Sequence, residues 1–384
     1  MSFDLAALGQ KIQRYRAQLQ LTTKDVSAAT GIEEPLLERI ENGREKPSGD
    51  QILILADFFR CDYKFFISNE KVAPFEQTEN LYRRYGDEFS AQDRRAVQDF
   101  LYLCETERYL QEALGRLPLE TPSVRLSGDF YKDHGFQAAS QVRTYLGYQT
   151  HEAPIAELYQ DLRKLGIHVF RRALGNSNIS GICIHHPVGG PCLLVNYSED
   201  VYRQRFSAAH EAAHALIDKD EEVVVSFFSE WTHKNLREVR ANSFASAYLL
   251  PPSFLQRIPD PRQWSEEKIR EWCRRLFVNA EALSIALKAS GLISDAQQQR
   301  FRTIRLSRDS KIDPELPDDL PPLSRERKQA LLRAGLSSRY VNLCFEAYHS
   351  GVISAARLAE VLLADERDVL AIANLFGVRL NDAD

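Results

Sequence analysis

Two histidines and a glutamate lie within little more than one helical turn, because residues 210–214 read His-Glu-Ala-Ala-His. Apolar residues at helical spacing around them predict an amphipathic helix that carries His210 and His214 on its inward face. Two buried imidazoles both need polar partners, and one divalent metal ion satisfies both. Glu211 lies about 100° round the helix from His210, so it is better placed to reach a metal-bound water than to be a ligand. The spacing therefore predicts a metal site with a general base beside it.

The next predicted helix offers a third ligand, Glu238. Pro251 and Pro252 end this helix. Its apolar positions recur at helical spacing: Ala241, Phe244, Ala245, Tyr248 and Leu249. Glu238 falls on the same face, and a buried carboxylate needs a partner such as zinc. Two histidines and one glutamate leave a fourth position open for water, as a catalytic zinc site requires. The alternative is a pair of core histidines with ordinary polar partners and a salt-bridged glutamate.

The two segments together resemble the ImmA/IrrE-type zinc metallopeptidases. The resemblance spans about residues 136–295, and the most specific matches are Arg205 to Leu216 around the histidines, then Glu238, Ala241-Asn242, Phe244-Ala245 and Leu249-Leu250-Pro251. It implies a zincin-like domain with a small sheet and a pair of metal-binding helices. It also implies that His210, His214 and Glu238 bind Zn²⁺. Glu211 would then be the general base, with Asn242 behind the ligands.

Hydrolysis of a peptide bond also needs a group that stabilises the tetrahedral intermediate. The sequence offers four donors near the motifs, each with a structural role as its alternative: Tyr197, Tyr202, His233 and Tyr248.

Residues 1–69 read as five short helices with a tight turn at Thr30-Gly31-Ile32. The order of Ile40-Glu-Asn-Gly ahead of Lys46-Pro-Ser resembles the Xre/Cro-type helix-turn-helix family. Such domains read the major groove with the start of the third helix. The resemblance suggests four cationic side chains that could contact DNA: Lys24, Arg39, Arg44 and Lys46.

The charge of this segment works against binding DNA. The predicted third helix opens with Glu33-Glu34 and continues to Glu38, and residues 1–70 hold nine Lys and Arg against eleven Asp and Glu. Acidic groups at the groove face oppose contacts with phosphates. Dimerisation, or gripping a protein substrate, is the alternative role of this domain.

The rest of the chain divides into a helical connector (70–135), the peptidase-like region (136–299), a basic strand with a Pro-rich linker (300–322) and a small helical domain (323–384). Basic and apolar residues alternate partly over 300–308, and Lys311 follows. This pattern suggests either a half-buried strand with a solvated face or a contact with nucleic acid or an acidic substrate. The expected fold class is α+β, mainly α, with an all-α N-terminal domain.

The composition places the chain among soluble globular proteins. It has 384 residues, of which 44% are hydrophobic and 27% charged, with a net charge of −5. That charge excludes a general polyanion binder. We expect no membrane association, because no apolar leader or membrane-spanning run is present. The six scattered cysteines form no CxxC pair, which favours a cytoplasmic location.

These features predict a regulatory zinc endopeptidase that cleaves a specific protein. The resemblance favours a transcriptional repressor as substrate, in stress response or in mobile-element and phage-related control. DNA is an expected partner of the N-terminal domain, and a homodimer is another expectation. Two alternatives stay open: a DNA-binding transcriptional regulator whose metal domain is a sensor or scaffold, and an antitoxin-like interaction protein.

Overall fold

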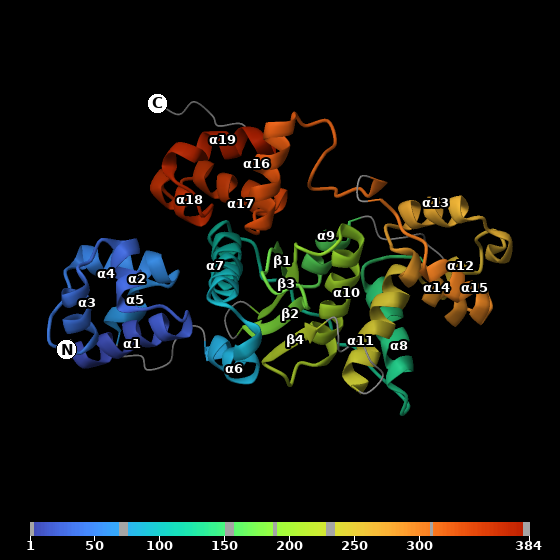
Figure 1. Cartoon of the computed structure of the whole chain (residues 1–384), viewed down its shortest axis with the longest axis horizontal. Coiled ribbons are helices and arrows are strands. Elements are labelled where there is room, and N and C mark those ends of the chain that lie inside the picture. The colour runs from blue at the N-terminus through green and yellow to red at the C-terminus, as the bar shows by residue number, and fades with distance from the viewer. Residues whose placement is uncertain are drawn as a thin grey trace. The chain divides into compact units, whose positions relative to one another are not determined.

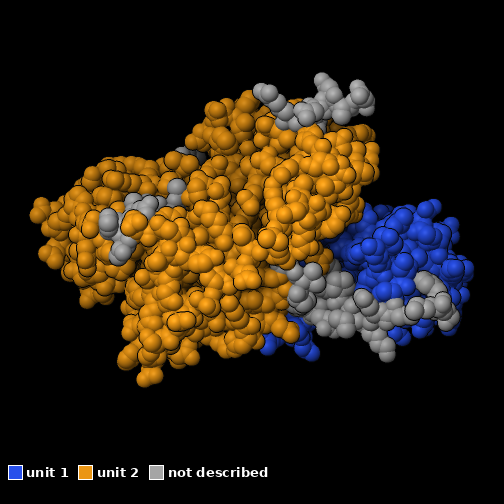
Figure 2. All heavy atoms as spheres, turned by 180° about the vertical axis from the view of Figure 1, so that it is seen from behind, with its two compact units in different colours: residues 1–103, 174–176 blue, residues 104–173, 177–384 orange. Residues whose placement is uncertain are grey.

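The computed structural model describes residues 4–68, 76–149, 157–186, 190–227, 235–307 and 310–378. They form two compact units, one of residues 1–103 with 174–176 and the other of residues 104–173 with 177–384 (Figure 2). The boundary falls inside one long helix, α7 (Ala91–Ala113). The segment expected to be a separate connector is therefore shared between the two units.

The first unit begins with five helices, in agreement with an all-α N-terminal domain. These are α1 (Leu5–Gln18), α2 (Thr23–Thr30), α3 (Glu34–Glu41), α4 (Gly49–Phe59) and α5 (Tyr63–Ile67), followed by α6 (Glu76–Tyr85) and the 3-10 turn η1 (Gly86–Glu88). Thr22 and Ser48 begin α2 and α4 with capping boxes. Gly31 ends α2 at a φ of 73°, which permits the sharp turn toward α3. Arg16 of α1 then fixes α3 through two contacts of 2.7 Å with Glu41.

The second unit contains the sheet, which has four strands in the part of the chain that the structure describes. They are β1 (His168–Arg172), β2 (Ile179–His186), β3 (Gly190–Asn196) and β4 (Val223–Phe227), in the order β1-β3-β2-β4. β1 and β3 are parallel, and the other two pairings are antiparallel. Nearly every position is buried, as expected of a sheet covered on both faces. The mixture of a small sheet with many helices confirms the predicted α+β class.

Helices of the second unit position the two metal-motif segments. α10 (Val201–Ile217) packs on β2 and β3, and α11 (Leu236–Leu249) packs against both α10 and α8 (Tyr131–Tyr145) (Figure 1). The remaining helices of this region are α9 (Leu158–Lys164), α12 (Pro252–Leu255), η3 (Pro261–Gln263), α13 (Glu266–Leu276), α14 (Ala280–Ala289) and α15 (Asp295–Arg302). The contact of α8 with α11 is close because Gly135 has no side chain: a Cβ there would lie 2.4 Å from the Arg240 carbonyl oxygen.

The strand predicted over residues 300–308 is wrong. Residues 300–302 complete helix α15, which begins with a capping box at Ser294, and residues 303–307 form no strand. Phe301 and Ile304 are both buried in the core of the unit, at a spacing of three that suits a helical turn. The apparent alternation of basic and apolar residues therefore arises because the apolar residues at the end of α15 face the core.

Lys311 is likewise not a free basic contact for nucleic acid or an acidic substrate. Its side chain is 7% exposed, forms an ion pair with Asp200 and donates a 2.9 Å hydrogen bond to Asn279. The predicted linker after it is also fixed to the unit: Arg171 binds Asp313 at 2.9 Å. Lys311 thus ties the segment before the linker to the start of α10.

Four helices follow within the described residues 310–378: α16 (Pro322–Arg333), α17 (Ser338–His349), α18 (Ala355–Val361) and α19 (Glu366–Phe376). The turn after α16 covers the edge of the sheet at β1, where Ala173 donates a 2.9 Å backbone hydrogen bond to Arg333. Phe170 and Tyr340 pack edge to face beneath it, with ring centroids 5.4 Å apart. The C-terminal helices are thus part of the second unit.

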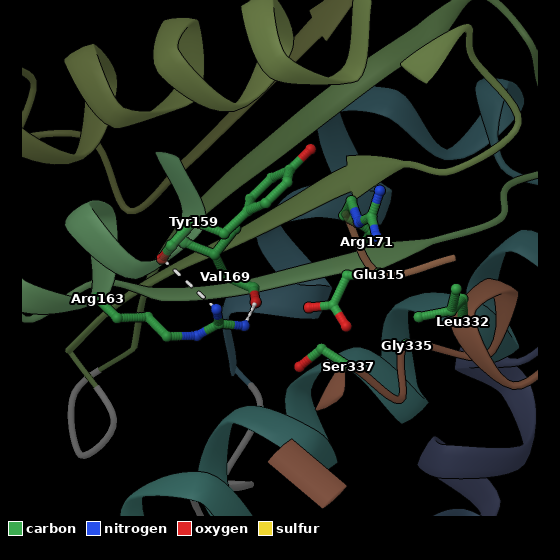
Figure 3. A pocket seen from close by; sticks show the side chains of 8 residues that line it. All are labelled: Tyr159, Arg163, Val169, Arg171, Glu315, Leu332, Gly335 and Ser337. Carbon is green, nitrogen blue, oxygen red and sulfur yellow. Dashed lines mark hydrogen bonds between the residues drawn. The ribbon is translucent and has the colours of Figure 1, made fainter. Parts of the chain in front are cut away.

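A small hollow lies where α9, β1, the linker and the α16–α17 turn meet (Figure 3). Its cationic side chains already have partners: Arg163 donates to the Val169 carbonyl at 2.7 Å, and Arg171 is paired with the linker. None of the predicted metal ligands lines this hollow.

Among the described residues, none of the helices combines the length and the apolar character needed to cross a membrane.

Candidate metal centre

Side chains from α10 and α11 converge at one buried point. His210, His214 and Glu238 each offer a ligand atom, and these atoms all lie within 4.8 Å of one another. The Nε2 atoms of the histidines are 3.2 Å apart, and Glu238 lies 3.1 Å from one and 3.4 Å from the other. The three residues are 0–5% exposed. The structure thus brings together the three residues that the sequence predicts as ligands.

A second set of residues orients the two imidazoles. Nδ1 of His210 lies 3.0 Å from the Asn242 side-chain oxygen, and Nδ1 of His214 lies 2.8 Å from an Asp218 oxygen. Both partner oxygens accept a hydrogen bond, so each Nδ1 carries a hydrogen and each Nε2 is the ring atom that faces a metal. Asp218 is in turn paired with Arg240. Sequence reasoning identified Asn242 but missed Asp218, although its position four residues after His214 was a usable signal.

The electrostatics of the cluster favour positive charge. Burial raises the pKa of Glu238, but hydrogen bonds from the two histidines outweigh this and hold the pKa well below its usual range. For His214, burial lowers the pKa, whereas hydrogen bonds to Asp218 and Glu238 raise it to about 10. A site in which carboxylates face two imidazoles at this depth fits a divalent cation, which would satisfy all three ligand groups at once.

Glu211 lies beside this cluster but faces the sheet. It is fully buried, and neither carboxylate oxygen makes a hydrogen bond of good geometry with the described residues. Burial raises its pKa, opposed by His210, His214 and a contact with the Ser226 hydroxyl of β4. A buried carboxylate without a well-placed donor can accept a proton from a water or substrate group that enters the site.

Capping residues fix where the two helices begin. Asp200 caps α10 by accepting hydrogen bonds from the backbone N–H groups of Tyr202 and Arg203, at 3.1 and 3.3 Å. Asn235 caps α11 through the N–H of Arg237 at 3.0 Å. Because each helix is held at its first turn, the register that puts the ligands face to face is set locally.

The tyrosines considered as transition-state donors belong to the packing of the unit. Tyr202 packs on Phe277 with ring centroids 6.2 Å apart, and Tyr248 stacks on Phe244 at 5.4 Å. The ring of Tyr197 lies 5.2 Å from the Arg171 guanidinium. His233 lies outside the described residues.

The four predicted DNA contacts, Lys24, Arg39, Arg44 and Lys46, are all exposed on the first unit. They share that surface with acidic groups: Glu33 and Glu38 are exposed, and Arg39 lies 3.5 Å from Glu45. These cations are therefore exposed to solvent, among groups of both charge signs.

Comparison with known protein families gives two matches. Residues 162–288 match the IrrE N-terminal-like domain, a peptidase family, and residues 7–63 match a helix-turn-helix domain. No curated protein matches the chain. The first match contains the whole His210, Glu211, His214 and Glu238 cluster, and the second contains all four predicted DNA contacts. The chain is thus a metallopeptidase-like regulator that joins a DNA-binding type of helix-turn-helix domain to an IrrE N-terminal-like domain.

Proposed function

We propose that the chain is a zinc-dependent endopeptidase that cuts one or a few protein substrates. His210, His214 and Glu238 would hold Zn²⁺, and Glu211 would be the general base. The observation that carries the proposal is the orientation of the two imidazoles: Asn242 and Asp218 occupy both Nδ1 atoms, so both Nε2 atoms meet at the Glu238 carboxylate. A pair of core histidines with ordinary partners has no reason to converge in this way.

Zn²⁺ held by His210, His214 and Glu238 would supply a Lewis acid that activates water and polarises a carbonyl group. Glu211 then takes a proton from the attacking water and passes it to the leaving amine. Its burial supports this role, because burial raises the pKa of the carboxyl group and so helps it to hold the proton between the two transfers. Asp218 and Asn242 keep the ligand rings fixed throughout.

The fusion of the two domains supports a regulatory substrate. A helix-turn-helix domain beside a peptidase can bring the enzyme to the DNA site where a repressor is bound, or can bind the similar domain of that repressor. We therefore propose a transcriptional repressor as substrate, in stress response or in control of a mobile element. Action on a substrate of this kind places the enzyme in the cytoplasm.

The experiment compares new protein N-termini in cells that express wild type or Glu211→Gln at equal levels, with and without DNA damage. We expect one or a few cuts that occur only with wild type, and these cuts also identify the substrate. Zinc content of the two purified proteins is the control, because Glu211 is not a ligand and both should bind equally. Identical N-termini in both strains, with zinc bound, would contradict the proposal and favour a sensor or scaffold role for the metal domain.

A further inference from the structure

Gly181 of β2 lies directly against the side chain of Glu211. A Cβ built on Gly181 would lie 2.6 Å from Cγ of Glu211, 2.8 Å from its Oε1 and 2.9 Å from its Cδ. Contacts this short are not tolerated, since a carbon atom in van der Waals contact lies about 3.5–4.0 Å from its neighbours. The space that the carboxylate occupies therefore exists because residue 181 has no side chain.

The backbone at Gly181 does not itself require glycine. Its φ is not among the positive values in the structure, and the residue sits in a strand paired with Ser226 of β4. The register between β2 and β4 shifts between Ile179 and Gly181, which marks an irregularity at this point of the sheet. Glycine inside a strand weakens it and often marks close approach of another group. Here that group is Glu211.

We propose that Gly181 is a positioning residue for the general base, forming with Ser226 a slot that holds the Glu211 carboxylate in one orientation beside the metal ligands. This inference rests on the proposed function. The slot explains how a carboxylate that makes no hydrogen bond of good geometry is nevertheless held fixed: strands β2 and β4 restrict it on one side, and α10 carries it on the other.

The proposal separates catalysis from metal binding. The three nearest atoms to an added Cβ all belong to the Glu211 side chain, and none belongs to a ligand or to the backbone. Gly181→Ala is therefore relieved by rotation of that side chain, which moves the base but leaves His210, His214 and Glu238 in place. The effect on the stability of the fold should be small.

Gly135 provides a matched control with the opposite expectation. A Cβ on Gly135 would lie 2.4 Å from the Arg240 carbonyl oxygen and 2.7 Å from the backbone nitrogen of Phe244. Both atoms belong to the backbone of α11, which carries Glu238. Gly135→Ala therefore has to shift the helix that supplies a ligand, so metal affinity and thermal stability should both fall.

The test uses full-length wild type, Glu211→Gln, Gly181→Ala and Gly135→Ala. For each protein we would measure zinc per chain, the visible spectrum after Co²⁺ substitution, and the melting temperature. Cleavage would be measured on a synthetic peptide spanning the cut found in wild-type cells. For Gly181→Ala we expect full zinc binding, an unchanged Co²⁺ spectrum and unchanged KM. Its kcat should be lower by about 100-fold or more, as for loss of a general base.

The outcomes distinguish the two proposals. Cleavage by Gly181→Ala within about threefold of wild type would overturn the positioning role and leave the peptidase intact. Loss of zinc or of folding in Gly181→Ala would also overturn it, because the glycine would then be required for structure. If wild type cleaves no better than Glu211→Gln in cells, the proposed function fails instead.

Discussion

The metal centre and the exposed face of α3 hold their charged groups in opposite ways. At the centre, His210, His214 and Glu238 are 0–5% exposed, and each imidazole has a partner on both ring nitrogens. On the α3 face, a pair such as Arg39 and Glu45 is 3.5 Å apart with side chains 51% and 46% exposed. Buried charges without partners are costly, whereas exposed pairs contribute little. The fold therefore determines how the side chains of the centre are oriented and charged, whereas the binding of a ligand to the exposed face of α3 depends on solution conditions.

The largest effect should follow from loss of a ligand charge. Glu238→Gln keeps the shape of the side chain but removes the carboxylate that faces both Nε2 atoms. Loss of a residue that only supports a ligand typically lowers metal affinity by about 10–100-fold. Loss of a ligand should have a larger effect, so we expect zinc affinity to fall by more than about 100-fold. Competition with a chromophoric chelator measures it. Wild-type affinity in this variant would mean that Glu238 is not a ligand.

A smaller loss of zinc affinity should follow from substitution of Asp218, which contacts Nδ1 of His214. Asp218→Asn weakens the partner of Nδ1, and changes of this kind typically lower metal affinity by about 10–100-fold. Asp220→Asn is the matched control, because its side chain is 70% exposed and pairs with Arg237 at the surface. The same chelator competition applies. Equal zinc affinities for the two variants would show that Asp218 does not support metal binding by His214.

DNA binding at the exposed face of α3 should depend on salt concentration, whereas metal binding at the buried centre should not. Arg44→Gln should weaken binding of a 20-base-pair duplex and reduce the slope of log affinity against log salt by about 1, as for loss of one phosphate contact. Glu38→Gln should act in the other direction at low salt, because it removes an exposed acidic group from α3. Fluorescence anisotropy at several salt concentrations measures both. If neither variant changes DNA binding, the exposed face of α3 does not contact DNA.

The smallest effect concerns a buried pair outside the centre, His168 of β1 and Glu107 of α7, whose Nδ1 and Oε2 atoms are 2.6 Å apart. Burial lowers the pKa of His168, but the hydrogen bond to Glu107 outweighs it, so the net shift is upward from 6.5. Burial raises the pKa of Glu107, but the same bond lowers it below 4.5 overall. The pair should thus stabilise the fold most between these two ordinary values.

The histidine contribution is present below its unfolded pKa and is lost as the pH rises through its folded pKa. His168→Gln should therefore lower the free energy of unfolding more at about pH 5.5 than at about pH 8.5. Urea denaturation at the two pH values measures the difference, with the exposed His349→Gln as control. A pH-independent loss would show that the pair acts through packing alone.

Helical spacing explains why part of the site could be predicted. Once residues 210–214 form one helix and Glu238 begins the next, their inward faces follow from periodicity. Gly181 could not be found in this way, because its importance comes from the approach of α10 to β2. The basic stretch at 300–308 was misinterpreted because a short helix end with Phe301 and Ile304 inside resembles an alternating strand. The ion pair of Lys311 could not be predicted from the sequence pattern, because its partner Asp200 is distant in sequence.

X-ray absorption spectroscopy at the zinc edge, on the purified full-length chain, would identify the atoms that bind the metal. We predict one zinc per chain, with two imidazole nitrogens at about 2.0–2.1 Å and oxygen atoms as the remaining ligands. Glu211→Gln should give the same ligand set. A sulfur shell at about 2.3 Å, or a spectrum without imidazole scattering, would place the metal elsewhere and contradict the assignment of His210, His214 and Glu238.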